Sequence, residues 1–310
     1  MVVKSGGEAA VAEWQCCFDE FLPGISLRWW DDPDLDNALV DYALVWAPEP
    51  GRLRQFSNLK AIFGAGAGVD LITRDPELPS HVPIVRCVPP EAGQRMAEYV
   101  LWAVLSLVRD ARRMFLAQQA LIWDEFEPRF TAHDYRIGIM GLGAVGERVA
   151  RSLRDFGLAV QGWSRHPKLL PGIRCFAGKY ERDEFLRTTD ILVCLLPATP
   201  ETEGIIAEPL LRQLPRGAGL IQVGRGIHHN MPDILAALDD GLLSGAILDV
   251  FEQEPLPAEH PAWLHPRLTI TPHNASTPTR RERARFIASA ITALQHGEAL
   301  SCIYDPNRGY

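Results

Sequence analysis

Short apolar segments alternate along the chain with stretches in which apolar residues recur every three or four positions. In the first hundred residues the short apolar segments are 25–30 (ISLRWW), 41–46 (DYALVW), 59–66 (LKAIFGAG) and 83–87 (PIVRC). Farther along they are 135–141, 158–163, 190–196, 219–224, 245–251 and 268–273. Their near-continuous apolar character is typical of strands covered on both faces, so the pattern predicts parallel sheets flanked by helices.

Amphipathic spacing marks a long helix in the middle of the chain. It begins near Glu91, just after two prolines, and its apolar residues share one face, as in a helix packed against a core. We expect it to run on through 109–123 and to bridge two parts of the chain. The apolar face comprises Met96, Val100, Ala103, Val104 and Leu107.

Two further helices have recognisable ends. The first follows the apolar segment 135–141, and Gly157 is placed to end it. The second closes the chain, with Thr277 as a candidate N-cap, Pro278 at the first helical position and Gly297 as its stop. Their apolar stripes are Val145, Val149 and Leu153 in the first, and Ile287, Ile291 and Leu294 in the second.

Composition narrows the class of protein. The chain is 47% hydrophobic with a net charge of −8, so its overall field repels nucleic acid, which we do not expect as a partner. No apolar run reaches the length of a membrane span, and the first ten residues lack the apolar core of a signal peptide. None of the six cysteines forms C-x-x-C, so zinc ligation has little support. Several cysteines lie in apolar surroundings, as in ILVCLLP, which is typical of buried thiols in a reduced compartment. We expect a cytoplasmic protein without membrane partners or a bound metal.

A glycine-rich turn connects the segment 135–141 to the helix after it. Gly141, Gly143 and Gly146 spell G-x-G-x-x-G. In a dinucleotide-binding fold the first glycine allows the tight turn, the second lets the backbone approach the pyrophosphate, and the third lets helix and strand pack closely. A purely structural glycine turn is the alternative, but a strand before and a helix after are the context that the nucleotide motif requires.

The residues after the next apolar segment indicate the cofactor. An acidic residue is expected roughly 20 residues beyond the glycines, where it binds the ribose hydroxyls of NAD. Ser164 and Arg165 occupy that place here, with Lys168 close behind. A hydroxyl and a guanidinium bind a 2′-phosphate that a carboxylate would repel, so the sequence favours NADPH (NADP). Ordinary solvated surface cations are the alternative interpretation, and NADH is the alternative cofactor.

Polar groups stand at the ends of three later apolar segments: Arg225, then Asp249 with Glu254, and then His273. Open α/β sheets bind ligands at this end of their strands. With the other motifs, these residues make the chain resemble the D-isomer-specific 2-hydroxyacid dehydrogenases, and within that family the glyoxylate/hydroxypyruvate reductase A branch. The resemblance covers nearly the whole chain, and its motifs are AGAGVD, GLGAVG, LLPATPET, GRG, LDVFEQEPLP and TPH.

The resemblance implies an α/β fold of two Rossmann-like domains, one flavodoxin-like and one dinucleotide-binding, with parallel sheets and a cleft between them. The order of the predicted elements agrees with such a discontinuous division. Residues 1–97 plus 276–310 are expected to form the substrate (catalytic) domain, and residues 98–275 the NADP-binding Rossmann domain. A homodimer is also implied, with the long helix and residues 121–126 (LIWDEF) as contact surface.

The resemblance further implies a catalytic triad of Arg225, Glu254 and His273, and the chemistry suits these residue types. A guanidinium can bind both oxygens of a 2-oxoacid carboxylate and polarise the neighbouring carbonyl. Hydride arrives from the nicotinamide C4, and an imidazolium can deliver a proton to the developing alkoxide. Glu254 beside His273 would favour the charged imidazole. Taken singly, each residue also has an ordinary structural interpretation, as a surface arginine, a turn acid or a structural histidine.

Substrate-binding residues are implied in the first domain as well. In the family, backbone amides of the GAGVD loop hold the substrate carboxylate, which indicates Ala67 and Gly68 here. A tight glycine turn after the preceding strand is an equally good interpretation. Trp46 is expected to line the pocket, and a core tryptophan is the alternative. Arg225 and His273 complete the predicted substrate-binding set.

Further cofactor contacts follow from the matching motifs. Asp249 matches the family residue that hydrogen-bonds the nicotinamide amide, and Leu196 and Pro197 match the loop that passes under the nicotinamide ribose. The complete predicted cofactor-binding set is Gly141, Gly143, Ala144, Val145, Gly146, Ser164, Arg165, Lys168, Leu196, Pro197, Thr202, Val223, Gly224 and Asp249.

The chain departs from the family pattern around Arg225. Gln222 stands where the family usually has Asn, and Asn274 replaces a commoner small residue. His228 and His229 are neighbours without the spacing of a metal site, and we interpret them as loop residues. These changes leave the triad whole and leave the choice of substrate open.

The resemblance and the cofactor together imply NADPH-dependent reduction of a small 2-oxoacid, either glyoxylate or hydroxypyruvate. A reductase of a bulkier 2-ketoacid is the near alternative. A non-enzymatic NAD(P)-sensing module is the alternative from another class, and the intact triad argues against it.

Overall fold

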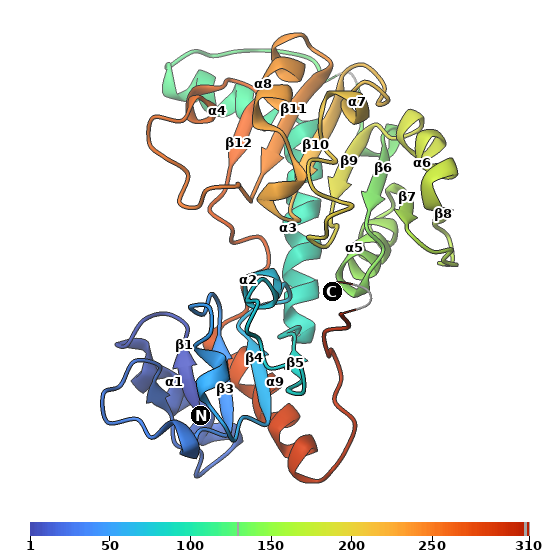
Figure 1. The fold of residues 1–310 in the computed structure, drawn as a ribbon. Helices are drawn as coiled ribbons and strands as arrows, with labels where there is room; N and C mark the ends of the chain where they lie inside the picture. Colours follow the sequence, from blue (N-terminus) through green and yellow to red (C-terminus); the bar gives the residue numbers. More distant parts are fainter. Residues whose placement is uncertain (129, 307–308, 310) are drawn as a thin grey trace. The chain divides into compact units, whose positions relative to one another are not determined.

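The computed structural model describes residues 1–128, 130–306 and 309, which form two compact units. Each unit is built on its own parallel sheet with helices packed against it (Figure 1), so the predicted α/β fold class is confirmed. Within the described residues, no helix combines the length and the apolar composition that crossing a bilayer requires. Unit 1 comprises Met1–Glu91 and Thr277–Tyr310, and unit 2 comprises Ala92–Ser276.

Five strands form the sheet of unit 1: β1 (Val2–Lys4), β2 (Arg28–Trp29), β3 (Tyr42–Val45), β4 (Ala61–Gly64) and β5 (Ile84–Val85). Their order is β2-β1-β3-β4-β5, which is the flavodoxin-like order (Figure 1). The sequence pattern missed β1, because three residues are too few to show a period. β1 nevertheless lies inside the sheet, where it pairs in parallel with both β2 and β3.

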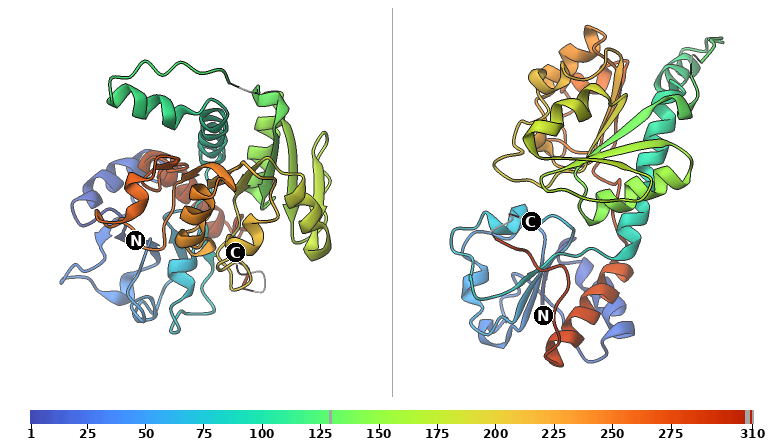
Figure 2. Two further views of the ribbon diagram at one scale, coloured as in Figure 1. Left: turned by 90° about the horizontal axis from the view of Figure 1, so that it is seen from above. Right: turned by 90° about the vertical axis from the view of Figure 1, so that its right-hand side faces the viewer.

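Two helices from distant parts of the chain, α1 (Ala10–Phe21) and α9 (Arg280–Gln295), lie side by side on one face of this sheet (Figure 2). Trp14 of α1 and Ile287 of α9 are buried with Phe63 of β4 in one apolar cluster. Residues remote in sequence therefore share the core of unit 1. The shorter elements of this unit are α2 (Asp70–Thr73) and the 3-10 turns η1 (Asn37–Leu39) and η2 (Leu53–Gln55).

The predicted N-cap of the last helix is wrong by two residues. Thr279, and not Thr277, precedes α9, and its hydroxyl accepts the backbone N–H of Glu282. The carboxylate of Glu282 in turn accepts the N–H of Thr279 at 2.8 Å, which completes a capping box. Only Thr279 has a glutamate three residues later, so the reciprocal pair decides where the helix starts. Gly297 follows the helix with φ +71°, as expected for its stop.

Seven strands form the sheet of unit 2: β6 (Arg136–Met140), β7 (Ala159–Ser164), β8 (Arg174–Ala177), β9 (Ile191–Cys194), β10 (Ala218–Gln222), β11 (Leu243–Leu248) and β12 (Leu268–Ile270). Their spatial order is β12-β11-β10-β9-β6-β7-β8, and every pairing is parallel (Figure 1). The direction of strand order reverses between β6 and β9, as in a dinucleotide-binding fold. The sequence pattern missed the edge strand β8.

Helices cover both faces of the unit 2 sheet, with one apolar cluster on each side. α3 and α5 contribute Val100, Val104 and Val149 to the first cluster, and α6 and α8 contribute Phe185 and Leu238 to the second. The elements are α3 (Pro90–Val108), α4 (Ala111–Gln119), α5 (Ala144–Asp155), α6 (Gly178–Arg187), α7 (Glu208–Leu211), α8 (Met231–Asp239), and the 3-10 turns η3 (Ala132–Asp134), η4 (Gly226–His228) and η5 (Pro261–Leu264).

The long helix expected to run on through 109–123 is interrupted. α3 ends at Val108, and Asp110 adopts a left-handed backbone with φ +52°, which cannot continue a right-handed helix. α4 starts afresh at Ala111, and none of its residues is buried. The prediction of one continuous helix was wrong because apolar spacing does not encode a single reversed backbone angle, which aspartate tolerates better than most residues.

Candidate active site

The predicted site residues of unit 2 follow neighbouring strands at the carboxyl edge of its sheet. In the spatial order of the strands, His273 follows β12, Asp249 follows β11 and Arg225 follows β10. The glycine turn follows β6, and Arg165 follows β7. Open α/β sheets bind ligands at such a carboxyl edge, beside the point where strand order reverses.

Two glycines of the turn are required by close contacts inside unit 2. Gly141 has φ +114°, and a Cβ there would lie 2.7 Å from the carbonyl oxygen of Leu195. A Cβ at Gly146 would lie 1.9 Å from the carbonyl oxygen of Gly141, because α5 starts directly against the turn. Neither position accommodates a side chain.

Gly143 differs from these two glycines because a Cβ there would meet no atom within 4 Å. It is the N-cap of α5, and no side chain caps the first amides of that helix. Ala144 and Val145 begin the helix, so their amides lie at its positive end. An open surface at the positive end of a helix fits the pyrophosphate of a dinucleotide.

The contrast between Gly143 and Gly146 gives a matched pair of variants. Gly146→Ala is expected to lower the melting temperature or to prevent folding, since the added methyl group meets backbone atoms. Gly143→Ala is expected to melt as the wild type but to bind NADPH about tenfold more weakly, a loss of ~1.4 kcal/mol. Thermal melts and titrations of NADPH fluorescence measure both effects. A stable Gly146→Ala protein with wild-type NADPH affinity would contradict this account of the turn.

The predicted phosphate-binding cations lie after β7 and beside α5. The guanidinium of Arg165 lies 3.7 Å from the carboxylate of Glu201, and the ammonium of Lys168 lies 3.7 Å from that of Glu147 in α5. The Ser164 hydroxyl donates to a backbone carbonyl two residues later. Hydrogen bonds from the backbone amide of Glu201 itself and from the side chain of Thr199 lower the pKa of Glu201, and the charge of Arg165 adds a smaller effect in the same direction. Exposed pairs at such distances are weak, so a phosphate can replace either carboxylate.

The loop after β9 keeps its shape through the hydroxyl of Thr202. This hydroxyl donates to the carbonyl of Pro197 at 2.7 Å and accepts the N–H of Thr199 at 3.0 Å. Leu196 is buried in the same loop. Thr202 was predicted as a cofactor contact, and in the structure its hydrogen bonds hold the loop that carries Leu196 and Pro197.

Glu254 and His273 form a hydrogen-bonded pair in unit 2. The imidazole Nδ1 of His273 lies 2.7 Å from Oε2 of Glu254, and Oε1 of Glu254 accepts the N–H of Phe251 at 2.9 Å. A carboxylate only accepts, so Nδ1 carries the hydrogen and Nε2 is the remaining site of proton exchange. The side chain of His273 is 32% exposed and that of Glu254 is 36% exposed, so a small molecule can reach both.

Asp249 holds the loop that carries His273. Its carboxylate accepts the hydroxyl of Thr271 at 2.5 Å and the backbone N–H groups of Asn274 and Ala275 at 3.0 Å. The hydroxyl of Tyr99 meets that of Thr271 at 2.6 Å, and burial raises the pKa of this tyrosine. Asp249 was predicted as a nicotinamide contact, and the contacts seen here are with the His273 loop. Sequence reasoning assigned no role to Thr271, which belongs to the TPH motif, or to Tyr99, which lies in no motif.

Arg225 is the last residue of the loop between β10 and η4, and its backbone is extended, with φ −140°. Its guanidinium donates to the carbonyl of Gly224 at 2.9 Å, and Val223 and Gly224 before it are buried. The side chain itself is half-buried. Since β10 and β12 both pair with β11, the strand ends that carry Arg225 and His273 flank the strand end that carries Asp249.

The substrate loop predicted in unit 1 follows β4 and contacts Trp46, which the sequence marked, and Arg86, which it did not. A Cβ at Gly66 would lie 2.9 Å from the ring of Trp46, so this glycine lets the half-exposed indole lie on the loop. Nε of Arg86 donates to the carbonyl of Ala67 at 2.9 Å. Neither Gly66 nor Gly68 has a positive φ, which favours close approach of a ring over a tight glycine turn as the reason for glycine.

Three of the residues that depart from the family pattern are buried around Arg225, whereas Asn274 is exposed. Gln222 and His228 are fully buried, and His229 is nearly so. Burial lowers the pKa of His229 to about 4, so this imidazole is neutral at physiological pH. His228, interpreted from the sequence as a loop residue, is the last residue of the 3-10 turn η4, and its side chain is buried. Among residues 1–128, 130–306 and 309, no group of three acidic, histidine or cysteine side chains could hold a metal ion.

Comparisons with known proteins cover the whole chain. The family description "D-isomer specific 2-hydroxyacid dehydrogenase, NAD binding domain" matches residues 101–275. Glyoxylate/hydroxypyruvate reductase A of Klebsiella pneumoniae is 42% identical over 305 residues, which cover 96% of each sequence.

Two solved structures show the same architecture. A D-isomer specific 2-hydroxyacid dehydrogenase of Xanthobacter autotrophicus Py2, in complex with NADPH and MES, has a TM-score of 0.92 at 39% identity and covers 100% of this chain and 98% of its own. An NADPH-dependent glyoxylate/hydroxypyruvate reductase of Sinorhizobium meliloti, in complex with NADP and sulfate, has a TM-score of 0.90 at 34% identity and covers 100% of this chain and 99% of its own.

Proposed function

The chain belongs to the D-isomer specific 2-hydroxyacid dehydrogenase family, in its glyoxylate/hydroxypyruvate reductase A branch, and from this membership we propose the reaction. The protein is an NAD(P)-dependent oxidoreductase that reduces small 2-oxoacids with NADPH: glyoxylate to glycolate, and hydroxypyruvate to D-glycerate. The pairing of His273 with Glu254 at 2.7 Å carries this proposal, because it provides an oriented proton donor at the carboxyl edge of the cofactor-binding sheet.

NADPH supplies the hydride when it is bound, and the residues of this chain do the rest. Arg225 binds the substrate carboxylate through its planar guanidinium and polarises the adjacent carbonyl. Nε2 of His273 donates a proton to the carbonyl oxygen as negative charge develops there. Glu254 accepts from Nδ1 and stabilises the imidazolium before the proton leaves. The carbonyl becomes a hydroxyl, and the histidine is reprotonated from water.

NADPH is the proposed cofactor, and the residues at its site fit the molecule. The open surface at Gly143 and the uncapped start of α5 suit the pyrophosphate. Ser164, Arg165 and Lys168 supply a hydroxyl and two cations for the 2′-phosphate. The solved relatives described above contain NADPH or NADP, which supports the same preference here.

Arg165→Asp is expected to shift the preference toward NADH. The ratio of kcat/KM with NADPH to that with NADH should fall by about tenfold to a hundredfold, the worth of a charge-assisted hydrogen bond of ~1.5–3 kcal/mol. Steady-state kinetics with both cofactors measure the ratio. Arg174→Asp, at an exposed pair with Glu184, is the matched control and should leave the ratio unchanged. Equal ratios in the wild type and Arg165→Asp would contradict the phosphate-binding role.

The reaction is tested by following the loss of NADPH absorbance after glyoxylate is added to the purified protein. Turnover distinguishes an oxidoreductase from a cofactor-binding module without activity. A panel of 2-oxoacids then separates small from bulky substrates through kcat/KM. Preference for a bulky 2-ketoacid would contradict the proposed substrate class without contradicting the reaction type.

The two units have separate proposed roles. In the proposal, unit 2 binds NADPH and carries the triad. Within unit 1, the proposed substrate contacts are Trp46 and the backbone of Ala67 and Gly68. The hydrogen bond from Arg86 to the Ala67 carbonyl supports this role, because it fixes the loop whose amides would bind a carboxylate.

We place the protein in the cytoplasm, where its six free cysteines would stay reduced.

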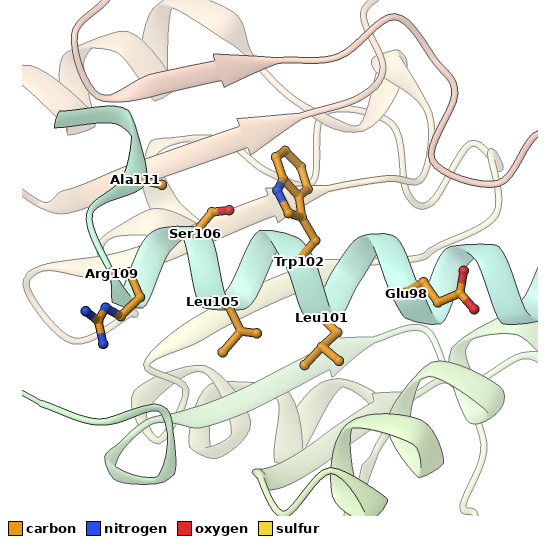
Figure 3. Close-up of a pocket in the computed structure, with 7 residues that line it drawn as sticks. All are labelled: Glu98, Leu101, Trp102, Leu105, Ser106, Arg109 and Ala111. Carbon is orange, nitrogen blue, oxygen red and sulfur yellow. The ribbon is translucent and has the colours of Figure 1, made fainter. Parts of the chain in front are cut away.

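A homodimer is the proposed assembly, with α3, α4 and the segment after α4 as contact surface. A shallow pocket runs along α3 and is lined chiefly by apolar side chains, among them Leu101, Trp102 and Leu105 (Figure 3). Leu121 and Trp123, beyond α4, are 94% and 92% exposed. Apolar exposure of this extent is typical of an association surface.

Trp123→Asp is expected to shift the protein from dimer to monomer in sedimentation velocity, because a carboxylate opposes burial of this surface. Leu264→Asp is the matched control and should remain a dimer, because Leu264 is also strongly exposed but lies in η5, outside the proposed contact surface. A wild-type protein that sediments as a monomer would refute the assembly outright.

A further inference from the structure

Two buried side chains hold the backbone of Arg225 from both sides. Nε2 of Gln222 donates to the carbonyl of Arg225 at 3.2 Å, and Nδ1 of His228 accepts the N–H of Arg225 at 3.0 Å. Both side chains have 0% exposure. Oε1 of Gln222 also accepts the N–H of Gly224 at 3.0 Å. The backbone that presents the guanidinium is therefore fixed by buried groups that water does not reach.

The partners of His228 determine where its hydrogen lies. A backbone N–H can only donate, so Nδ1 of His228 is the acceptor toward Arg225. A carbonyl can only accept, so Nε2 carries the hydrogen and donates to Pro197 at 3.1 Å. The ring is thus a neutral imidazole with both nitrogens hydrogen-bonded. A Cβ at Gly224 would lie 2.7 Å from Nδ1, so this glycine leaves room for the ring.

These hydrogen bonds connect two loops of the site within unit 2. Arg225 lies in the loop between β10 and η4, and Pro197 lies in the loop after β9. The first loop carries the proposed anchor of the substrate carboxylate. The second carries the proposed apolar contact with the nicotinamide ribose. One imidazole therefore joins the substrate anchor to the cofactor loop.

We propose that His228 is a positioning residue that sets the place of Arg225 relative to the cofactor loop. This inference rests on the proposed function. It gives a role to a histidine that the triad does not use and that the sequence placed in a loop. His228 touches neither the substrate nor the cofactor in this account, and it acts through the backbone of Arg225 and the carbonyl of Pro197.

Two conservative variants separate the two hydrogen bonds. Asparagine places its Oδ1 near the position of Nδ1, so His228→Asn keeps the acceptor for Arg225 and loses the donor to Pro197. Glutamine places its Nε2 near the ring Nε2, so His228→Gln keeps the donor to Pro197 and loses the acceptor for Arg225. The two variants remove the same ring, so a difference between them reports the individual hydrogen bonds.

We expect the two variants to fail in different ways. His228→Gln should lower kcat/KM for glyoxylate by about 10²-fold at saturating NADPH, because a small displacement of a positioned group costs that much. Its NADPH dissociation constant should stay near the wild-type value. His228→Asn should keep most of kcat/KM at saturating NADPH and should bind NADPH several-fold more weakly, as measured by fluorescence titration.

Gln161→Met is the matched control for the loss of buried hydrogen bonds. Nε2 of Gln161 donates to the carbonyl of Phe185 at 3.0 Å and to the hydroxyl of Thr189 at 2.8 Å, inside the same unit. Gln161→Met should lower the melting temperature and leave both kcat/KM for glyoxylate and the NADPH dissociation constant unchanged. If the two His228 variants behave like Gln161→Met, or lose both readouts in parallel, the positioning role is overturned.

The measurements also distinguish this inference from the proposed function. Failure of the wild type to turn over glyoxylate contradicts the proposed function. Wild-type kinetics and NADPH affinity in both His228 variants, beside an active wild type, contradict only the inference. Should the wild type be inactive, the NADPH titrations still decide: equal affinity in His228→Asn and the wild type overturns the link to the cofactor loop.

Discussion

Replacing His273 by asparagine is expected to lower kcat/KM for glyoxylate by about 10²–10⁴-fold, the usual contribution of a positioned general acid. Glu254 holds Nδ1 at 2.7 Å, so Nε2 is the atom that can deliver a proton to the carbonyl oxygen. Asparagine has no proton of suitable acidity. It is preferred to alanine because residue 273 has φ +52°, a backbone conformation that asparagine tolerates. Steady-state kinetics at saturating NADPH measure the loss.

Thermal melts of His273→Asn should match those of the wild type, which separates a chemical effect from a folding defect. Glu254→Gln provides the companion variant: it keeps the shape of the side chain and removes the charge that stabilises the imidazolium, so its loss should be smaller. Turnover at the wild-type rate by purified His273→Asn would show that another group delivers the proton, and the proposed mechanism would then be abandoned.

Replacing Arg225 by lysine is expected to lower kcat/KM for glyoxylate by about 10²–10³-fold, although the charge is kept. The reason is geometric, since a planar guanidinium can bind both carboxylate oxygens and an ammonium is a single point charge. In Arg225→Lys the backbone of residue 225 keeps its hydrogen bonds to Gln222 and His228, so the loop should keep its shape. Kinetics with glyoxylate and titration with oxalate, a planar carboxylate analogue, measure the loss of the anchor.

NADPH affinity is the internal control for Arg225→Lys and should stay at the wild-type value. An unchanged kcat/KM and unchanged oxalate binding would mean that the carboxylate is anchored elsewhere, for example by the amides of Ala67 and Gly68. A parallel fall in NADPH affinity would indicate a displaced loop and would contradict a purely substrate-directed role. The two variants at 225 and 273 therefore test the two halves of the proposed chemistry separately.

The order of apolar segments and turns was sufficient to predict the α/β class and most of the strands. Segment 190–196 contains strand β9, and segment 245–251 overlaps the second half of strand β11, because strands buried on both faces need apolar residues throughout. Gly141 and Gly146 were recognised by spacing alone, and the structure gives a steric reason for each. These features are local, since each depends on residues close together in the chain.

The sequence left other local features undetermined because their signals are weak or reciprocal. β1 is only three residues long and becomes a strand by pairing with neighbours on both sides. The break at Asp110 rests on one backbone angle, which leaves the apolar spacing unaltered. The start of α9 at Thr279 depends on the matching side chain of Glu282, and a proline near Thr277 drew attention to the wrong residue.

The sequence by itself determined which residues carry polar chemistry at strand ends, including Arg225, Glu254 and His273. Only the tertiary structure decided what surrounds them: that Glu254 meets His273, that Asp249 holds the loop of His273, and that His228 joins Arg225 to the loop after β9. Periodicity encodes which side of an element is buried, whereas the partner of a buried polar group depends on strand order. Groups from segments far apart in the chain become neighbours only when the parallel sheet forms.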